Sequence, residues 1–216
     1  IPTTRSLAVI TTGQEVRREA LLPGSILTRI ASSHIRVGTF EFAANQKDEV
    51  LLKSLLDYTI KRHCPEVFDC SNKAVGLIEN MMQKQSDLIV HWMRVGFIHG
   101  VMNTDNMTLS GETIDYGPCA FMDNYDPNTF FSSIDRGGRY SFMNQPLITQ
   151  WNLARLIEAL LPLIDNNVDN AVKLGEKLID KFDDSKNKKT FQFPLLEKGF
   201  TNEDILRGIE VLLSRK

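Results

Sequence analysis

The sequence of 216 residues lacks several features that would place it in a specialised class of protein. Lys and Arg number 25 and Asp and Glu 27, so the net charge is -2 and no excess of positive charge is available to hold nucleic acid. No apolar run approaches the roughly 18 to 20 residues of a membrane span, and no charged start precedes an apolar stretch as in a signal peptide. We therefore expect neither nucleic acid nor a membrane as a partner, and any anion site must be local.

Cysteine is scarce as well. Cys64, Cys70 and Cys119 are too few and too scattered for a disulfide framework or a zinc site, although Cys64 and Cys70 could pair. Cys119 has no cation among its sequence neighbours that would lower its pKa, which favours a small packed residue over a reactive thiol. This usage fits a reducing, intracellular compartment.

The chain also lacks an initial Met and a polar leading segment. It opens "IPTTRSLAVITTG", and the β-branched run "LAVITT" is typical of a strand that needs neighbours. Because 42% of the residues are hydrophobic, the chain can bury a substantial core. We expect the middle part of a longer protein.

The first 45 residues have the apolar pattern of β structure. Four short strands separated by Gly13 and by "LPG" at residues 22–24 are predicted, as an antiparallel meander that ends with "IRVGTFEFA". The sheet is expected to pack against the helices that follow.

The pattern changes to helical spacing near Asp48. Helices are predicted over residues 48–63, from 71 or 72 to about 97, and over 148–161, 169–182 and 202–213, with a polar linker between the last two. The fold class is therefore α+β in two lobes: residues 1–45 form an incomplete sheet lobe, and residues 46–216 form a helical lobe that contains an unusual turn at 99–121.

That turn reads "HGVMNTDNMTLSGETIDYGPCAF" and is called the acidic turn below. A hairpin with Gly111 at its tip would bring Asp115 back toward Asn106, and an amide oxygen and a carboxylate that converge are good ligands for Mg²⁺ or Mn²⁺. Asp105 would point elsewhere and be available as a base beside the metal. The alternative is an Asx-rich turn whose side chains only cap backbone amides. His99 is expected to be structural, through a backbone hydrogen bond.

The order of elements resembles that of protein kinases, which carry H-R-D-x-x-x-x-N after a long helix and then D-F-G. His99 and Asn106 match the kinase His and Asn, and Asp115 matches the metal-binding Asp. Val101 stands in the place of the catalytic Asp and cannot accept a proton. Either the protein is a non-catalytic relative of kinases, or Asp105 has taken over the role of base.

The strings "IPTTR", "LTRIASSHIRVGTFE", "HGVMNTDNM", "TIDYGP" and "NQP…QWNLARL" resemble the selenoprotein O family, called YdiU in bacteria. The resemblance covers roughly residues 1 to 165 well. It implies a protein-kinase-like fold and transfer of a nucleoside monophosphate from a flipped ATP to protein hydroxyls. On matching positions it implies Asp105 as base, Asn106 and Asp115 as metal ligands, and Arg29 and Arg36 as ligands of the γ-phosphate.

The residues allow the assignment of the two arginines. Arg29 and Arg36 are seven apart and would face opposite sides of a continuous strand, but "ASSH" between them tolerates a bend that would let both guanidiniums converge on one phosphate. Two surface arginines on a twisted sheet are the alternative.

The function expected from the resemblance is metal-dependent protein adenylyltransfer from ATP, or uridylyltransfer from UTP, with Mg²⁺ or Mn²⁺ as cofactor and Ser, Thr or Tyr hydroxyls of proteins as acceptors. A non-catalytic nucleotide-binding scaffold and an ordinary phosphotransferase are the alternatives. The resemblance places a glycine-rich loop, a phosphate-binding Lys and its Glu partner before residue 1, so this chain by itself is expected to be nearly inactive. It implies the cytoplasm in a bacterium and the mitochondrion in a eukaryote.

Overall fold

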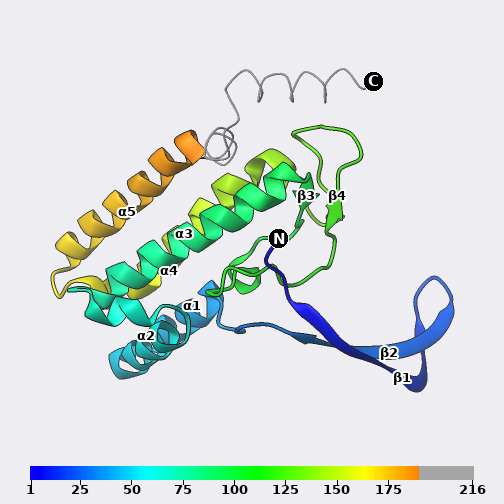
Figure 1. Cartoon of the computed structure of the whole chain (residues 1–216), viewed down its shortest axis with the longest axis horizontal. Helices are drawn as coiled ribbons and strands as arrows, with labels where there is room; N and C mark the ends of the chain where they lie inside the picture. Colours follow the sequence, from blue (N-terminus) through cyan, green and yellow to red (C-terminus); the bar gives the residue numbers. More distant parts are fainter. Residues whose placement is uncertain (190–216) are drawn as a thin grey trace.

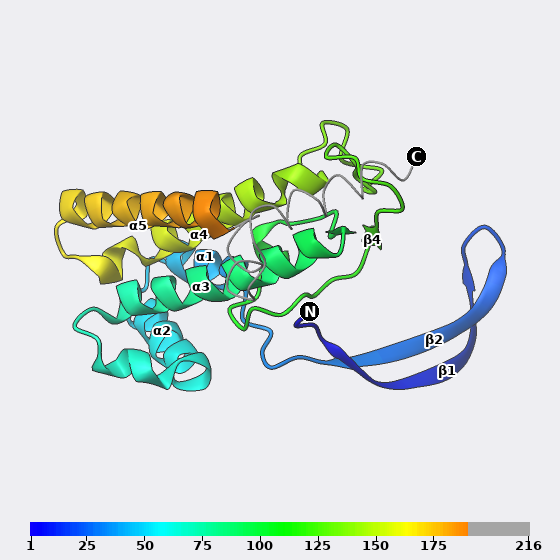
Figure 2. The same cartoon turned by 45° about the horizontal axis from the view of Figure 1, so that its top comes forward.

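A body of helices and a long β-hairpin that projects from it make up the computed structural model, which describes residues 1–189 (Figures 1 and 2). Five longer helices form the body: α1 (Val37–Asn45), α2 (Glu49–His63), α3 (Lys73–Arg94), α4 (Gln145–Ile164) and α5 (Val168–Lys189). The short helical turns are η1 (Pro65–Asp69), η2 (Thr104–Asn106) and η3 (Phe142–Asn144), and β3 (Phe97–Ile98) pairs antiparallel with β4 (Ala120–Phe121). The predicted mixture of an antiparallel sheet with a mostly helical remainder is confirmed.

The hairpin consists of β1 (Arg5–Arg17) and β2 (Leu21–Ile30), paired antiparallel from Arg5 opposite Ile30 to Arg17 opposite Leu21. The prediction of four short strands in residues 1–45 is therefore wrong. Gly13 has a φ of +72° and lies where the register shifts, so it forms an irregularity within β1 and does not end the strand.

"LPG" at 22–24 also lies inside a strand, β2. Pro is tolerated there because β2 is an edge strand, which has no neighbour on its other side in the described structure.

The predicted packing of this sheet against the helices is wrong too. Apart from Gly24, every residue of β1 and β2 is exposed, and both views show the hairpin extending away from the helical body. Exposed apolar side chains on it include Leu7, Val9, Ile10, Ile26 and Leu27. Among residues 1–189, the hairpin meets the body at its base, where the guanidinium of Arg29 lies over the Tyr116 ring.

The segment "VGTFEFAAN" is helix α1, although its alternating apolar residues suggested a fourth strand. Val37, Phe40 and Ala43 recur at a spacing of three residues and are the buried side chains, which is the periodicity of a helix face. At the start of α1, the backbone N–H of Arg36 donates to the hydroxyl of Thr39 at 3.1 Å. The helix packs against α4 and α2.

The helices predicted from residue 48 onward are confirmed where the structure describes them. The carboxylate of Asp48 accepts from the Leu51 N–H at the start of α2, and the amide oxygen of Asn72 accepts from the Val75 N–H at the start of α3. Residues 183–189 belong to α5, so the predicted linker does not begin there. The helix predicted over 202–213 lies outside the described residues.

The main hydrophobic core lies between these helices. α4 contributes Leu153, Leu156 and Leu160, which are fully buried among side chains from α1, α2, α3 and α5. A second cluster joins the end of α3 to β3 and to the start of α4. The acidic turn runs along the junction of the two clusters, since Met107 and Leu109 belong to the first and Met102 to the second.

One described segment, Phe142–Ile164, is long and apolar enough to cross a membrane by length and composition, with a mean hydropathy of 1.2. Half of it is buried inside the protein, where α4 contacts α1, α3 and α5, as expected of a core helix.

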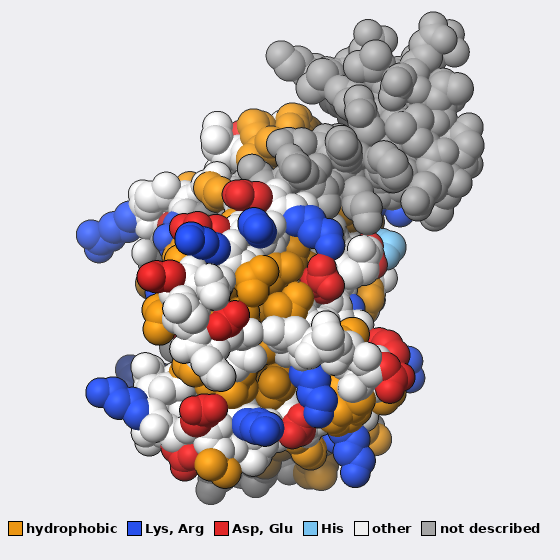
Figure 3. Space-filling view, turned by 90° about the vertical axis from the view of Figure 1, so that its left-hand side faces the viewer, with side chains coloured by type: hydrophobic (Ala, Val, Ile, Leu, Met, Phe, Trp, Pro, Cys, Tyr) orange, Lys and Arg blue, Asp and Glu red, His pale blue; other side chains and the backbone are white. Residues whose placement is uncertain are grey.

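The molecular surface seen in Figure 3 carries Lys and Arg side chains interspersed with Asp and Glu, with apolar atoms between them.

The contrast between core and hairpin gives a stability prediction. Leu156→Ala should lower the free energy of unfolding by about 2 to 5 kcal/mol, because it leaves a cavity in a fully buried site. Leu27→Ala, on a side chain that is 44% exposed, should cost less than about 1 kcal/mol. Urea unfolding followed by circular dichroism measures both. Equal losses would contradict the placement of the core.

Candidate active site

The acidic turn is held from both sides by the two chain segments at the base of the hairpin. On one side, the Val37 N–H donates to the Met107 carbonyl at 2.9 Å, and the Leu109 N–H donates to the Ile35 carbonyl at 2.9 Å. On the other side, the Thr113 N–H donates to the Pro2 carbonyl at 3.1 Å. Residues that are far apart in sequence therefore form one small backbone network around the turn.

The chain reverses at Gly111, which has a φ of +75°. The Thr108 hydroxyl closes the reversal, because it donates to the Glu112 carbonyl at 2.8 Å and accepts from the Glu112 N–H at 3.1 Å. Within the described chain, the two arms of the turn do not pair with each other as strands. The predicted hairpin is thus a reversal whose arms pair with the neighbouring segments.

His99 joins the two arms. Its ring is fully buried, and Nε2 donates to the Ile114 carbonyl at 2.7 Å while Nδ1 accepts from the Val101 N–H at 3.3 Å. These two bonds require the neutral ring with its proton on Nε2. Burial lowers the pKa of His99, although the bond to Ile114 and the charge of Asp115 act in the opposite direction. The predicted structural role of His99, through a backbone hydrogen bond, is confirmed.

The hydrogen bonds of His99 link the chain segments that carry Asn106 and Asp115. The amide nitrogen of Asn106 donates to the Val101 carbonyl at 2.9 Å, so its amide oxygen is the atom available to a cation. Asp115 follows Ile114 directly, is exposed, and has a φ of +58°, which is uncommon outside glycine. An amide oxygen and a carboxylate are hard donors suited to Mg²⁺ or Mn²⁺, with phosphates and water as further ligands. The residues fit such a metal, and their assignment as its ligands stays a prediction.

In the described part of the chain, no three His, Cys, Asp or Glu side chains come together as a metal site. Asn106 and Asp115 supply two protein ligands, a number typical of Mg²⁺ sites that substrate phosphates complete.

Asp105 lies in η2 and is exposed. Its carboxylate lies against the first turn of α1, where a Cβ atom on Gly38 would overlap Oδ1. The amino end of a helix favours a negative charge. Asp105 is therefore next to the proposed metal ligand Asn106 in sequence, and its carboxylate lies beside the first turn of α1.

Both arginines reach the acidic turn, at different points. Arg36 donates from Nη1 to the backbone carbonyl of Asp105 at 3.4 Å, and among the described residues its buried Nε has no hydrogen-bond partner. Arg29 donates to the Thr4 hydroxyl at 3.2 Å, and its guanidinium lies 4.4 Å from the centre of the Tyr116 ring, a cation–π contact. Their role as phosphate ligands stays a prediction.

Cys119 has a cation nearby that its sequence neighbours did not reveal, because the charge of Arg29 acts to lower its pKa. Burial has the larger effect and raises the pKa of the thiol, which fits the expected packed residue. Cys64 is buried and Cys70 exposed, and both are free thiols, so the pairing that the sequence left open is not formed.

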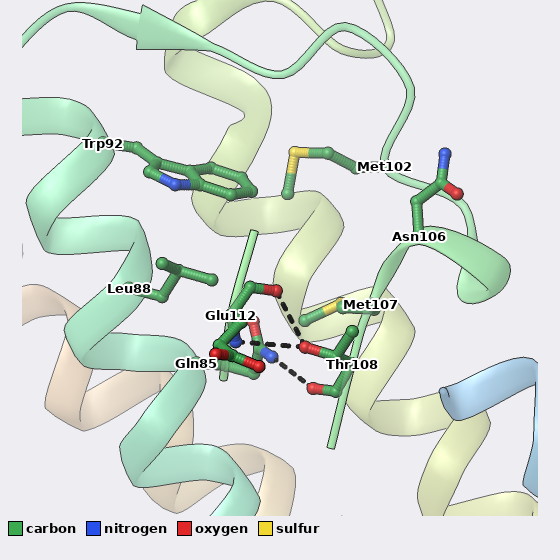
Figure 4. A pocket seen from close by; sticks show the side chains of 8 residues that line it. All are labelled: Gln85, Leu88, Trp92, Met102, Asn106, Met107, Thr108 and Glu112. Atoms are coloured by element: carbon green, nitrogen blue, oxygen red, sulfur yellow. Dashed lines mark hydrogen bonds between the residues drawn. The ribbon is translucent and has the colours of Figure 1, made fainter. Parts of the chain in front are cut away.

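A small cavity lies behind the turn, with room for about one water molecule. Figure 4 shows its lining, in which Gln85 of α3 donates to the Thr108 carbonyl at 2.8 Å, while the amide of Asn106 points away from Thr108 and Glu112. The bonds of Gln85 and of Trp92, which donates to the Thr113 hydroxyl at 3.0 Å, fix the turn to α3.

Sequence reasoning missed three contributors to the site. Gly38 and Glu112 gave no signal, since each depends on contacts with distant segments. Tyr116 stood inside the quoted string "TIDYGP", but nothing there indicated that its ring would contact Arg29.

Comparison with known proteins places the chain in a family. A family model described as "Protein adenylyltransferase SelO" matches residues 1–207. The "Protein nucleotidyltransferase YdiU" of Alcanivorax borkumensis is 62% identical over 182 residues, which are 84% of this chain and 38% of that protein. The protein of the same name from Pelagibacter ubique is 53% identical over 204 residues, 94% of this chain and 42% of that protein.

The class indicated by the match and by these relatives is that of protein nucleotidyltransferases. The chain belongs to the SelO family, also called YdiU. It spans about two fifths of the length of the curated relatives that it matches.

The buried, neutral His99 gives a pH prediction. Its folded-state pKa is lowered, so the unfolded chain binds the proton more readily, and the stability due to the neutral ring is complete above about pH 6.5 and lost as the pH falls below that value. His99→Gln should cost about 1 to 3 kcal/mol near neutral pH, and this difference from the wild type should shrink toward about pH 5.

Urea unfolding of both chains across this pH range measures the difference. Burial also lowers the pKa of His63, but that residue is present in both chains and cancels in the comparison. A difference that stays constant with pH would contradict the role given to His99.

Proposed function

We propose that the whole protein is a metal-dependent protein adenylyltransferase, which transfers AMP from ATP to Ser, Thr or Tyr hydroxyls of other proteins, with UMP transfer from UTP as a variant of the same chemistry. The observation that carries the proposal is that Asp105, Asn106 and Asp115 lie on one turn that two arginines contact, while Val101 cannot act as a base. Membership of the SelO family supports it.

Asp105 is the proposed general base. A substrate hydroxyl oxygen attacks the α-phosphorus of ATP, the bond from that phosphorus to the bridging oxygen breaks, and pyrophosphate leaves. The hydroxyl proton passes to the carboxylate of Asp105, which is exposed and is not one of the proposed metal ligands.

Asn106 and Asp115 are the proposed ligands of Mg²⁺ or Mn²⁺, which when bound neutralises charge on the phosphates. The bond from the Asn106 amide nitrogen to Val101 supports this role, because it fixes the side chain with its oxygen outward. Arg29 and Arg36 are the proposed ligands of the γ-phosphate, which departs with the pyrophosphate.

We also propose that the architecture is kinase-like, with residues 1–45 as part of the smaller lobe and 46–216 as the helical lobe. The order of long helix α3, acidic turn and further helices supports this division. α1 lies at the end of the first segment and packs against α2 and α4, so it forms the contact between the two proposed lobes.

Labelled ATP separates this function from its alternatives. With Mg²⁺ or Mn²⁺ present, label at the α-phosphate should appear on protein and label at the γ-phosphate should not. Asp105→Ala should abolish labelling while leaving nucleotide binding intact. The chain of 216 residues alone should label protein more slowly than the whole protein, because the resemblance places the phosphate-binding Lys before residue 1. The factor should be on the order of 10² or more, which is the typical effect of losing one preorganised charge-stabilising group.

Transfer of γ-label would instead establish an ordinary phosphotransferase, and nucleotide binding without any transfer would establish a scaffold. Each of these two results would overturn the proposal.

Gly38→Ala tests the placement of Asp105. The new methyl group would overlap the end of the Asp105 side chain, which can rotate away, so stability should change by less than about 1 kcal/mol while α-label transfer falls by about tenfold or more. Gly137→Ala is a matched control, because a Cβ at Gly137 meets nothing within 4 Å. Thermal melts and initial rates measure both properties. Full activity in Gly38→Ala would show that Asp105 need not occupy this position.

A further inference from the structure

The bend between Arg29 and Arg36 is fixed by contacts with two distant parts of the chain. Ser32, in the middle of "ASSH", is bonded through its N–H, its hydroxyl and its carbonyl. Each of these bonds goes to a charged side chain. An exposed loop residue needs no such partners for its own solvation, since water can supply them. The contacts therefore define the path of the bend.

Glu112, at the tip of the acidic turn, holds the first two groups of Ser32. Its Oε2 accepts from the Ser32 N–H at 2.8 Å and its Oε1 accepts from the Ser32 hydroxyl at 3.0 Å, while Ser110 donates to Oε2 at 3.0 Å. The backbone of Glu112 is itself bonded to the Thr108 hydroxyl in both directions. The carboxylate thus attaches the bend to the turn that carries the proposed metal ligands.

Arg62, in the last turn of α2, holds the third group. Its Nε and Nη2 both donate to the Ser32 carbonyl, at 3.0 and 2.7 Å. A guanidinium with two donors on one oxygen fixes direction as well as distance. The two peptide units that meet at Ser32 are therefore held from opposite ends, one by the acidic turn and the other by the helical body.

Ser32 lies between the two arginines, so the contacts that hold it also determine where Arg29 and Arg36 lie. It is three residues after Arg29, which contacts Tyr116, and four before Arg36, which contacts Asp105. Two arginines seven residues apart on a straight strand would face opposite sides. They reach the same turn here because the chain bends at the residue that Glu112 and Arg62 hold.

We propose that Glu112 and Arg62 are positioning residues that set the spacing of Arg29 and Arg36 and thereby the affinity for the γ-phosphate of the nucleotide. This inference rests on the proposed function. Glu112 and Arg62 act on the nucleotide through Ser32 and the two arginines. Their loss therefore weakens binding of a triphosphate and leaves binding of a monophosphate nearly unchanged.

The test compares the affinities of the whole protein for α,β-methylene-ATP, which cannot release pyrophosphate, and for AMP, by calorimetry with Mg²⁺. Glu112→Ala and Arg62→Ala should each weaken binding of the triphosphate analogue by about tenfold more than binding of AMP, the scale of one charge-assisted hydrogen bond. Ser32→Ala retains the N–H and carbonyl bonds and should have a smaller effect than Glu112→Ala.

Asp48→Ala is the matched control. It removes the capping carboxylate at the opposite end of α2, and so destabilises the same helix without touching Ser32. It should lower the melting temperature and leave the ratio of the two affinities unchanged. A change in that ratio with Asp48→Ala would mean that loss of stability alone explains the effect, and would overturn the proposal.

The double substitution Arg29→Ala with Arg36→Ala separates the positioning role of Glu112 and Arg62 from the γ-phosphate assignment of the two arginines. If it changes the ratio of affinities and Glu112→Ala and Arg62→Ala do not, the positioning role is wrong and the γ-phosphate assignment stands. If the double substitution itself leaves the ratio unchanged, the γ-phosphate assignment fails and the positioning role fails with it.

Discussion

The pairing of the acidic turn with the two segments at the base of the hairpin is the constraint on which the candidate site depends. Residues 35–37 bond to one arm of the turn and residues 2–4 to the other. An isolated turn rich in Asp and Asn has many conformations of similar energy. Backbone bonds on both sides remove that freedom and bring Asp105 beside α1 and Tyr116 beside Arg29.

Behind the turn, a buried polar network supplies the rigidity that the exposed acidic residues cannot supply for themselves. Gln85 and Trp92 of α3 each donate a side-chain hydrogen bond to an oxygen of the turn, and the buried ring of His99 bonds one arm of the turn to the other. Such bonds are costly to leave unmade once the groups are buried. The acidic side chains can therefore face solvent while the backbone of their turn is bonded to buried side chains.

The helical body was predictable because its signals are local. Asp48 and Asn72 cap helices whose apolar residues recur at helical spacing, and packing against α4 does not alter that period. The hairpin and α1 were not predictable in the same way. Gly13 within β1 and Pro23 within β2 carry turn signals that strand pairing overrides, and "VGTFEFAAN" fits either period until α4 and α2 provide the surface that buries Phe40.

The sequence by itself determined the family, the identity of the candidate site residues and the helical periods, because a motif such as "HGVMNTDN" followed by "TIDYGP" and a capped apolar repeat are both readable over a few consecutive residues. Only the tertiary structure decided what those residues touch. Gly38 lies against Asp105, Glu112 and Arg62 hold Ser32, and Arg29 contacts Tyr116. Such contacts join segments 30 to 87 residues apart, as from Arg62 to Ser32 or from Arg29 to Tyr116, and depend on the path of the whole chain, which no local pattern specifies.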